Sequence, residues 1–292
     1  MAEQEIQVPL WRKLALLTAT FAIIPAAAIA WSLLDANEAM IKQVSREVRL
    51  SATSEVSLEL DAALAALQPD GVILTPPHSD NPLILRLLED GKIPFARIGS
   101  ADTETGITLT MDDTGSARMA TEHLIELGHR RIGLIAGPPE YGLSAWRIDG
   151  WRQAMTAAGL PTEGLLEAGD FGFETGVVAA RKLLEGAQPP SAIVASSDKM
   201  TLATLETARA MGLEVPKDLS LISFDNTPIA RFTHPPLTAI DQPVAKTVAR
   251  AVELIIAAQG RKDLPEMPVV IPGSLVQRDS TTRAPATSPN GS

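Results

Sequence analysis

The stretch from Ala192 to Asn226 reads Ala-Ile-Val-Ala-Ser-Ser-Asp-Lys-Met-Thr-Leu-Ala-Thr-Leu-Glu-Thr-Ala-Arg-Ala-Met-Gly-Leu-Glu-Val-Pro-Lys-Asp-Leu-Ser-Leu-Ile-Ser-Phe-Asp-Asn. The apolar run Ala192–Ala195 predicts a short strand, and the Ser-Ser-Asp that follows consists of residue types favoured at helix N-caps. Apolar residues then recur at helical spacing as far as Gly212, a typical helix stop. A second apolar run, Leu219–Phe224, predicts another strand that ends at Asp225. The stretch therefore predicts a strand, helix, strand unit.

This unit brings polar residues to one edge of a sheet. Parallel strands joined by a helix cross over in the right-handed sense, so the residues after both strands emerge on the same side. Ligands of open α/β sheets bind at that edge. Ser197 and Asp225 are therefore candidate binding residues. The alternative is that Ser197, Asp198 and Asp225 serve only as helix caps and turn formers.

The same alternation of strand and helix runs along the chain from about residue 70. Apolar runs predict strands at 72–74, 94–98, 107–111, 132–136 and 165–169, and helical spacing predicts helices near 83–88, 115–127, 145–158 and 177–184. Regular alternation of this kind is typical of a doubly wound, parallel α/β architecture. The 292 residues fit one large domain or two lobes of about 100 to 150 residues each.

Charge and cysteine content exclude several functions. The formal net charge is -10 and no extended basic stripe occurs, so the chain is a poor candidate for holding nucleic acid by itself. The absence of cysteine excludes disulfides, thiol catalysis and thiolate metal sites. A chain without cysteine is compatible with the cytoplasm or the periplasm.

The amino-terminal region has two interpretations. Leu14–Leu34 is an uncharged run that is long enough to span a bilayer, with Arg12 and Lys13 before it, as an anchor with a cytoplasmic amino terminus requires. Alternatively, Leu14 to Thr20 is a buried strand and the alanine-rich stretch after it is a helix. Chain length favours the second interpretation, because a lobe whose third strand begins near Asp70 needs about 60 earlier residues for two strand-helix units.

Enzyme signatures are absent from the sequence. No phosphate-binding loop, dinucleotide fingerprint, serine-nucleophile elbow or His-Glu-x-x-His pair occurs. Asp112 and Asp113 could indicate a metal, but no third ligand lies in register with them. We therefore predict a protein that is not an enzyme and has neither cofactor nor metal.

A set of polar and aromatic residues follows the ends of the predicted strands. A guanidinium, carboxylates, an amide and an aromatic face are what a polyhydroxyl ligand needs. The alternatives are that Arg147 pairs with Asp149 or Glu140 at the surface and that Phe171 is plain core. The candidate ligand-binding residues are Asp112, Trp146, Arg147, Phe171, Ser197, Asp225 and Gln242.

Several motifs, in order, resemble the effector-binding domain of the lactose-repressor (LacI) family. The resemblance covers about residues 70 to 280. Its motifs are Thr121-Glu-His-Leu-Ile-Glu-Leu-Gly-His-Arg-Arg-Ile-Gly-Leu-Ile-Ala-Gly-Pro138, Ala195-Ser-Ser-Asp-Lys-Met200, Val215-Pro-Lys-Asp-Leu-Ser-Leu-Ile-Ser-Phe-Asp225, Pro236-Leu-Thr-Ala-Ile-Asp-Gln242 and Leu275-Val-Gln-Arg-Asp-Ser280.

The resemblance implies two lobes of the periplasmic-binding-protein type I fold, each a doubly wound parallel sheet, that close on a small ligand such as a sugar. It implies that Arg147 grips the ligand, that Phe171 supplies an aromatic surface and that Asp225 accepts ligand hydroxyls. It also places Gln242 near the crossover between the lobes. Ser197 stands where the family usually has asparagine, which leaves the identity of the ligand open.

The front of the chain departs from the family. Nothing in residues 1–68 resembles the family's helix-turn-helix, its hinge helix or its usual first strand. We therefore predict the sensor domain of a LacI-type regulator that is cytoplasmic, homodimeric, and bound to DNA only through a helix-turn-helix missing from this chain. The alternative is a membrane-anchored or periplasmic solute-binding protein that serves a sugar transporter or receptor.

The predicted organisation has five parts. They are an atypical segment at 1–68, either the start of the first lobe or a segment with a membrane anchor at 14–34; the rest of the first lobe at 69–111; the second lobe at 112–241; a crossover back to the first lobe at 242–279; and a disordered tail at 280–292, rich in Ser, Thr, Pro and Ala.

Overall fold

The computed structural model describes residues 64, 66–76, 78–100, 102–139, 141–260 and 264–284. Both interpretations of Leu14–Leu34 concern residues outside these ranges. None of the helices in the described ranges combines the length and apolar character that a bilayer crossing needs.

The chain folds into two compact units. The first contains the described residues up to Thr110 together with Ala245–Val269, and the second contains Met111–Val244 and the described residues from Val270 onward. The chain therefore crosses between the units at three points. The predicted crossover segment 242–279 does not belong to the first unit throughout, because residues from Val270 return to the second unit.

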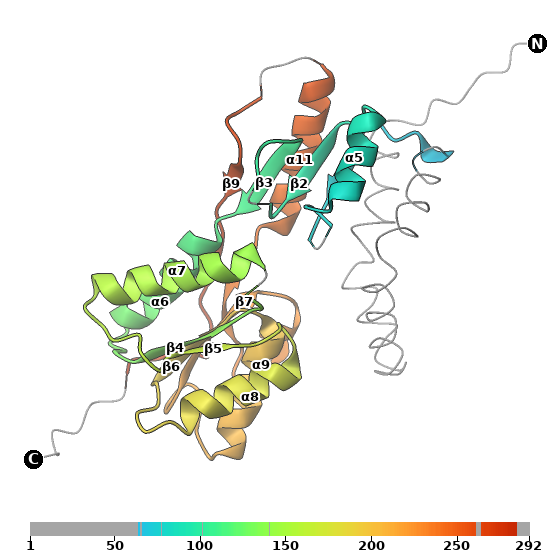
Figure 1. The fold of residues 1–292 in the computed structure, drawn as a ribbon. Helices are drawn as coiled ribbons and strands as arrows, with labels where there is room; N and C mark the ends of the chain where they lie inside the picture. Colours follow the sequence, from blue (N-terminus) through green and yellow to red (C-terminus); the bar gives the residue numbers. More distant parts are fainter. Residues whose placement is uncertain are drawn as a thin grey trace, which may run out of the picture. The chain divides into compact units, whose positions relative to one another are not determined.

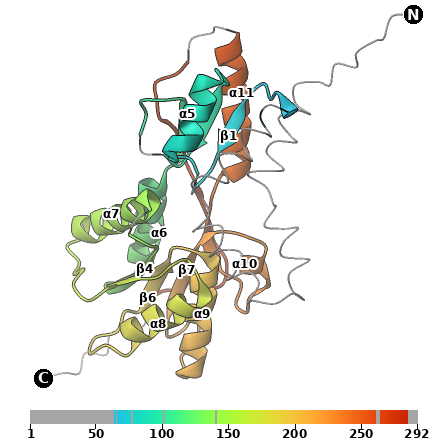
Figure 2. The ribbon, with the colours of Figure 1, turned by 45° about the vertical axis from the view of Figure 1, so that its right-hand side comes forward.

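The first unit is a small sheet that is buried on both faces. Its strands lie in the order β1-β2-β3-β9, and β1, β2 and β3 pair in parallel. Alternate strand residues point to opposite faces, so one set packs on α5 and the other on α11 (Figure 2). The elements are β1 (Val72–Leu74), α5 (Pro82–Asp90), β2 (Phe95–Ile98), β3 (Ile107–Met111), α11 (Val244–Gln259) and β9 (Val269–Ile271), of which β3, α11 and β9 run one or two residues past the boundary of the unit.

The second unit is built on a six-stranded sheet in the order β10-β8-β7-β6-β4-β5. Four neighbouring pairs are parallel, and β10 joins the edge antiparallel to β8. The elements are α6 (Asp113–Glu126), β4 (Ile132–Ala136), α7 (Gly142–Ala157), β5 (Leu166–Ala168), α8 (Phe173–Leu184), β6 (Ala192–Ala195), α9 (Asp198–Ala210), β7 (Ser220–Asp225), α10 (Ile229–Phe232), β8 (Thr238–Asp241) and β10 (Ser274–Val276).

The central strands of this sheet are apolar on both sides because helices cover both faces. Residues such as Leu134, Val194 and Ile222 pack toward α6 and α7, whereas their neighbours Ile135 and Ile193 pack toward α8 and α9. Figure 1 shows the two helix layers on opposite sides of β4 and β6. The predicted doubly wound α/β fold is confirmed, with one antiparallel strand added at the edge of the larger sheet.

The start of the predicted disordered tail is ordered. Ser280 is fully buried, where its hydroxyl donates to the carbonyl of Leu221 and its carbonyl accepts from the Leu221 amide. The amide of Ala284 donates to the carbonyl of Leu127. The prediction of disorder is therefore wrong for residues 280–284, because composition does not reveal that the sheet offers this segment hydrogen-bond partners.

Candidate functional site

The carboxyl ends of β6, β7 and β8 lie side by side in the second unit. Their parallel registers pair Ala195 with Ser223 and Asp225 with Asp241. The residues after each strand, including Ser196, Asp225 and Gln242, therefore gather at one edge of the sheet, where ligands of open α/β sheets bind.

Helix α7 carries Arg147 to this edge. A side chain at Gly150 would collide with the carbonyl of Thr114, so the glycine lets α7 pack closely against the first turn of α6. One residue later, buried Trp151 fixes the helix to the sheet by donating its indole N–H to the carbonyl of Ile132 at 3.1 Å. The Gly150-Trp151 pair thereby sets the depth and rotation at which Arg147 enters the unit.

Arg147 is buried and paired inside the unit. Its Nε donates to Oδ1 of Asp113 at 2.7 Å, its Nη1 donates to the carbonyl of Ser196 at 2.6 Å, and its guanidinium lies 4.3 Å from the ring centre of Phe224. Asp149, one of the two alternative surface partners, is therefore not its partner here, and the other, Glu140, lies outside the described residues. Among the described residues, Nη2 has no hydrogen-bond acceptor, so the guanidinium keeps donor capacity.

Other buried polar atoms around Arg147 also keep unused capacity. The amide of Gln242 donates from Nε2 to Oδ1 of Asp113 at 3.3 Å, while its Oε1 has no partner within the described part of the chain. The hydroxyls of Ser144 and Ser196 are likewise buried without a hydrogen bond to any described residue. Buried polar groups are normally paired, so the cluster can accept and donate further hydrogen bonds.

Asp225 ends β7 in an unusual backbone conformation and with a shifted pKa. Its φ is +90°, a value rare for residues with a side chain. Burial raises the pKa of its carboxyl to about 6; Arg147 opposes this rise, and the carboxylates of Asp198 and Asp113 add to it. The side chain is half-buried, so near neutral pH its carboxyl is an ionised acceptor that is only partly hydrated.

Phe171 and Ser197 lie together beside this cluster. A side chain at Gly137 would collide with the ring of Phe171, so the glycine lets the ring cover the end of β4. Phe171 is half-buried, with its ring centre 6.2 Å from that of Tyr141. The hydroxyl of Ser197 donates to the carbonyl of Phe171 and accepts from the amide of Met200, so it serves as the N-cap of α9.

The two remaining candidates occupy the starts of helices. Asp112 is the N-cap of α6, where its Oδ1 accepts from the amide of Gly115 at 2.8 Å. Trp146 is half-buried in α7 and its indole lies along Gly142. The structure thus brings Arg147, Gln242 and Asp225 together, and it uses Asp112 and Ser197 as caps.

Sequence reasoning gave no binding role to two of the charged residues at this edge. Asp113 holds both Arg147 and Gln242, and the sequence drew attention to its neighbour Asp112 instead. Asp198 was interpreted as a cap, but its Oδ2 accepts from the amide and hydroxyl of Thr227 at 2.7 and 2.6 Å. The signal available in the sequence was the pair of adjacent acids, Asp112 and Asp113. Only one of two adjacent acids can serve as the N-cap, so the other is left to make a different contact.

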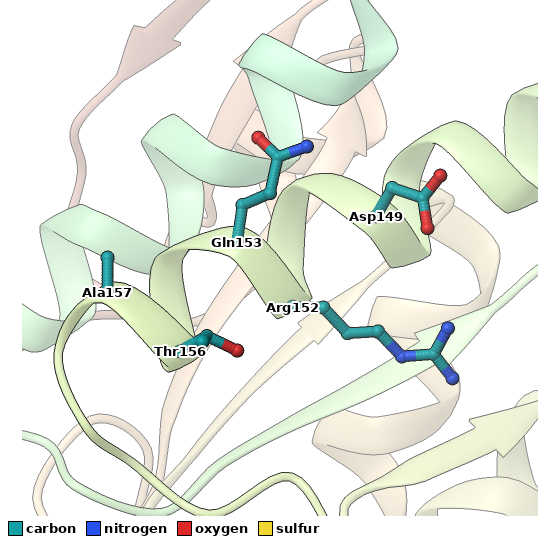
Figure 3. A pocket seen from close by; sticks show the side chains of 5 residues that line it. All are labelled: Asp149, Arg152, Gln153, Thr156 and Ala157. Atoms are coloured by element: carbon teal, nitrogen blue, oxygen red, sulfur yellow. The ribbon is translucent and has the colours of Figure 1, made fainter.

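One pocket lies away from this edge. It is lined by Asp149, Arg152, Gln153, Thr156 and Ala157, whose side chains all rise from the exposed face of α7 (Figure 3). A ligand site normally draws groups from several elements, so this depression is a weaker candidate than the strand edge. No three His, Cys, Asp or Glu side chains in the described ranges are grouped as a metal ion would need.

The covered parallel sheet and the polar groups at its carboxyl edge define a ligand-binding α/β domain. A family model for a periplasmic binding protein-like domain matches residues 121–281. The regulator CelR of Thermobifida fusca is 38% identical over 63% of this chain and 55% of its own length. The repressor CytR of Escherichia coli K12 is 41% identical over 51% of this chain and 44% of its own length.

Solved structures agree with these matches. A CelR-cellobiose complex is 33% identical with a TM-score of 0.69, covering 78% of this chain and 71% of that one. A LacI-family regulatory protein from Chloroflexus aggregans is 31% identical with a TM-score of 0.70, covering 78% of this chain and 82% of that one. The chain belongs to the LacI family of periplasmic-binding-protein-like domains. It spans about half the length of the two regulators matched by sequence.

Proposed function

We propose that this chain is the effector-binding domain of a LacI-type transcription regulator and that its effector is a sugar or a related polyhydroxyl metabolite. The cluster of Arg147, Asp113 and Gln242 carries the proposal, because it is buried at the ligand edge of the sheet and keeps unused hydrogen-bonding capacity. The relative CelR has been solved as a complex with cellobiose, a neutral disaccharide, which supports a ligand of this class.

In this proposal Arg147 donates from Nη2 to ligand hydroxyls and Asp225 accepts from them. Phe171 offers an aromatic face, and Gln242 offers its Oε1. A ligand shifts a protein toward the conformation that it contacts better, so the bound effector would change DNA affinity in a dimeric regulator. We place such a regulator in the cytoplasm, with DNA and a second copy of the chain as partners.

The test is a thermal-shift and calorimetric screen of the full chain against cellobiose, maltose and glucose. A sugar at about 100 times its dissociation constant stabilises the folded state by about 2.7 kcal/mol, which raises the melting temperature of a chain of this size by roughly 5–10 °C. Asp225→Ala should abolish the shift. The control Asp149→Ala removes the same charge from the exposed face of α7 and should not alter it.

Two results would count against the proposal. One is a wild-type chain that none of the sugars stabilises, and the other is an Asp225→Ala variant with unchanged affinity.

The apolar run Leu14–Leu34 favours a second candidate, a membrane-anchored solute-binding protein. Membrane partitioning of the expressed full chain, compared with a chain from which residues 1–34 have been deleted, distinguishes the two.

A further inference from the structure

We propose that Asn226 and Arg278 are positioning residues, which hold the turn after β7 in the one conformation that presents Asp225 at the ligand edge. The proposal rests on the ligand-binding function proposed above. It gives the segment that returns after residue 270 a part in effector affinity, although neither side chain is required to touch the effector.

The turn begins with two successive residues in a backbone region that favours glycine. Asp225 has a φ of +90° and Asn226 a φ of +52°. Asparagine tolerates positive φ better than most residues, whereas aspartate at +90° lies outside the usual left-handed region. Such conformations persist where the surrounding structure over-determines them and cluster at ligand sites. We therefore expect several contacts to fix the conformation of this turn.

The side chain of Asn226 provides the first of these contacts. Its Nδ2 donates to Oδ1 of Asp241 at 2.6 Å, and its Oδ1 accepts from Nη2 of Arg278 at 2.6 Å. Asp241 is the residue opposite Asp225 in the parallel pairing of β7 with β8. The amide thus fastens the turn to the neighbouring strand and to the returning segment at once.

Arg278 can act as a fixed support because it is held independently of the turn. Its amide donates to Oγ1 of Thr238 at 2.9 Å, and its Nη1 donates to the carbonyl of Leu237. Its carbonyl accepts from the same Thr238 hydroxyl at 3.2 Å. The guanidinium therefore spans from the start of β8 to the turn, and a lysine could not make both contacts, because its single ammonium lacks the fork.

The other flank of the turn is held from α9. Oδ2 of Asp198 accepts from both the amide and the hydroxyl of Thr227. Asp198 is buried, and its Oδ1 accepts from the hydroxyl of Ser223 on β7. Asp225 therefore lies between Ser223 and Asn226, each of which is held by side-chain hydrogen bonds. Its position depends on side chains that come from three other parts of the unit.

Three variants separate the loss of the side-chain contacts from the loss of the backbone conformation of the turn. Asn226→Gly keeps access to positive φ and removes both side-chain contacts. Asn226→Ala removes the contacts and disfavours the conformation as well. Arg278→Lys removes the fork but keeps the charge. The matched control is Arg181→Lys on α8, an exposed arginine that pairs with Glu185.

The first readout needs no effector. In the ligand-free full chain, the Asp225 carboxyl is titrated by carbon NMR after assignment with Asp225→Asn. Its surroundings are Arg147, Asp198 and Asp113, and burial is the largest cause of its raised pKa. Release of the turn exposes the carboxyl to water, so the pKa should fall from about 6 toward its ordinary value in all three variants. Arg181→Lys should leave it unchanged.

The second readout is the affinity for the sugar found in the screen. Asn226→Gly and Arg278→Lys should each weaken binding about five-fold or more. The double variant should be little weaker than either, because both changes break the same chain of hydrogen bonds from Arg278 through Asn226 to Asp241. A lower melting temperature with unchanged titration and unchanged affinity would reduce Asn226 and Arg278 to a structural role and overturn the proposal. So would fully additive losses.

The two readouts also separate this proposal from the function on which it rests. If no sugar binds the wild-type chain, the proposed function fails while the titration still decides whether Asn226 and Arg278 position Asp225. If a sugar binds and the titration of Asp225 is the same in every variant, the function stands and the positioning role is overturned.

Discussion

Each unit of this chain contains a buried arginine, and the two arginines are used differently. Arg97 on β2 is 1% exposed, and its partners Asp80 and Asp102 keep 56% and 49% of their side-chain surface. Arg147 on α7 is 5% exposed, and its partner Asp113 only 4%. The first arginine thus meets carboxylates that water still solvates, whereas the second meets one that water barely reaches.

Their hydrogen bonds differ in the same way. Arg97 donates from all three nitrogens: Nε to the carbonyl of Ser79, Nη2 to Asp80, and Nη1 to Asp102 and Thr105. It fastens the loops after β1 and β2 and has no nitrogen left over. Arg147 leaves Nη2 without an acceptor among the described residues. Burial alone therefore does not distinguish the two arginines, whereas incomplete pairing does, and the proposed ligand site rests on that difference.

The largest expected effect follows from the buried pair in the second unit. Arg147→Ala leaves the carboxylate of Asp113 uncompensated and should destabilise the chain by about 3–5 kcal/mol. Urea unfolding followed by circular dichroism measures this loss. Adding Asp113→Asn should restore most of the stability but no sugar binding. If Arg147→Ala is as stable as the wild type, the pair is hydrated in solution and the contrast with Arg97 disappears.

The next effect is the dependence of stability on pH, which has opposite signs for Asp225 in the second unit and Asp102 in the first. The pKa of Asp225 is raised to about 6 from an ordinary 3.8. Below the ordinary value the carboxyl is neutral in both folded and unfolded chains, and above about pH 6 the folded chain holds a disfavoured charge. The contribution of Asp225 to stability therefore falls as the pH rises from 4 to 6.

Asp225→Asn removes this cost. Above pH 6 the variant should be more stable than the wild type, by at most about 3 kcal/mol for two pKa units, and the gain should vanish below pH 4. Sugar affinity should show the reverse dependence, rising from pH 5 to pH 7 as the acceptor ionises and failing to rise in the variant. If the variant is less stable than the wild type at pH 7, the carboxylate is better solvated than the structure implies.

The sequence predicted the fold well because its strands are short, apolar and bounded by clear helix signals. The strands at 72–74, 107–111, 132–136 and 192–195 match those expected residue for residue. Periodicity reports which side chains are buried, and burial on both faces is what a doubly wound sheet imposes.

The site was less predictable, because its contacts join residues far apart in the chain. Asp113 and Gln242 meet across 129 positions, and no local pattern reveals such a pair. The pairing of Asn226 with Asp241 depends on the register of β7 against β8, which the spacing of apolar residues does not fix. Arg97 falls within the strand predicted at 94–98, and one charge in an apolar run does not say whether loops will close over it.

The smallest expected effect concerns Arg97, the buried arginine of the first unit. The pKa of Asp102 is lowered, first by the amide of Glu104 and then by Arg97, so this carboxylate favours folding above its ordinary pKa and loses that effect as the pH falls. Arg97→Met releases Asp80 and Asp102 to water instead of burying them unpaired. It should lower stability at pH 7 by only about 1–2 kcal/mol, and the difference from wild type should shrink below pH 4. Urea unfolding at the two pH values tests this. A loss as large as that of Arg147→Ala would mean that the loops of the first unit bury their carboxylates in solution, so that both arginines support their units in the same way.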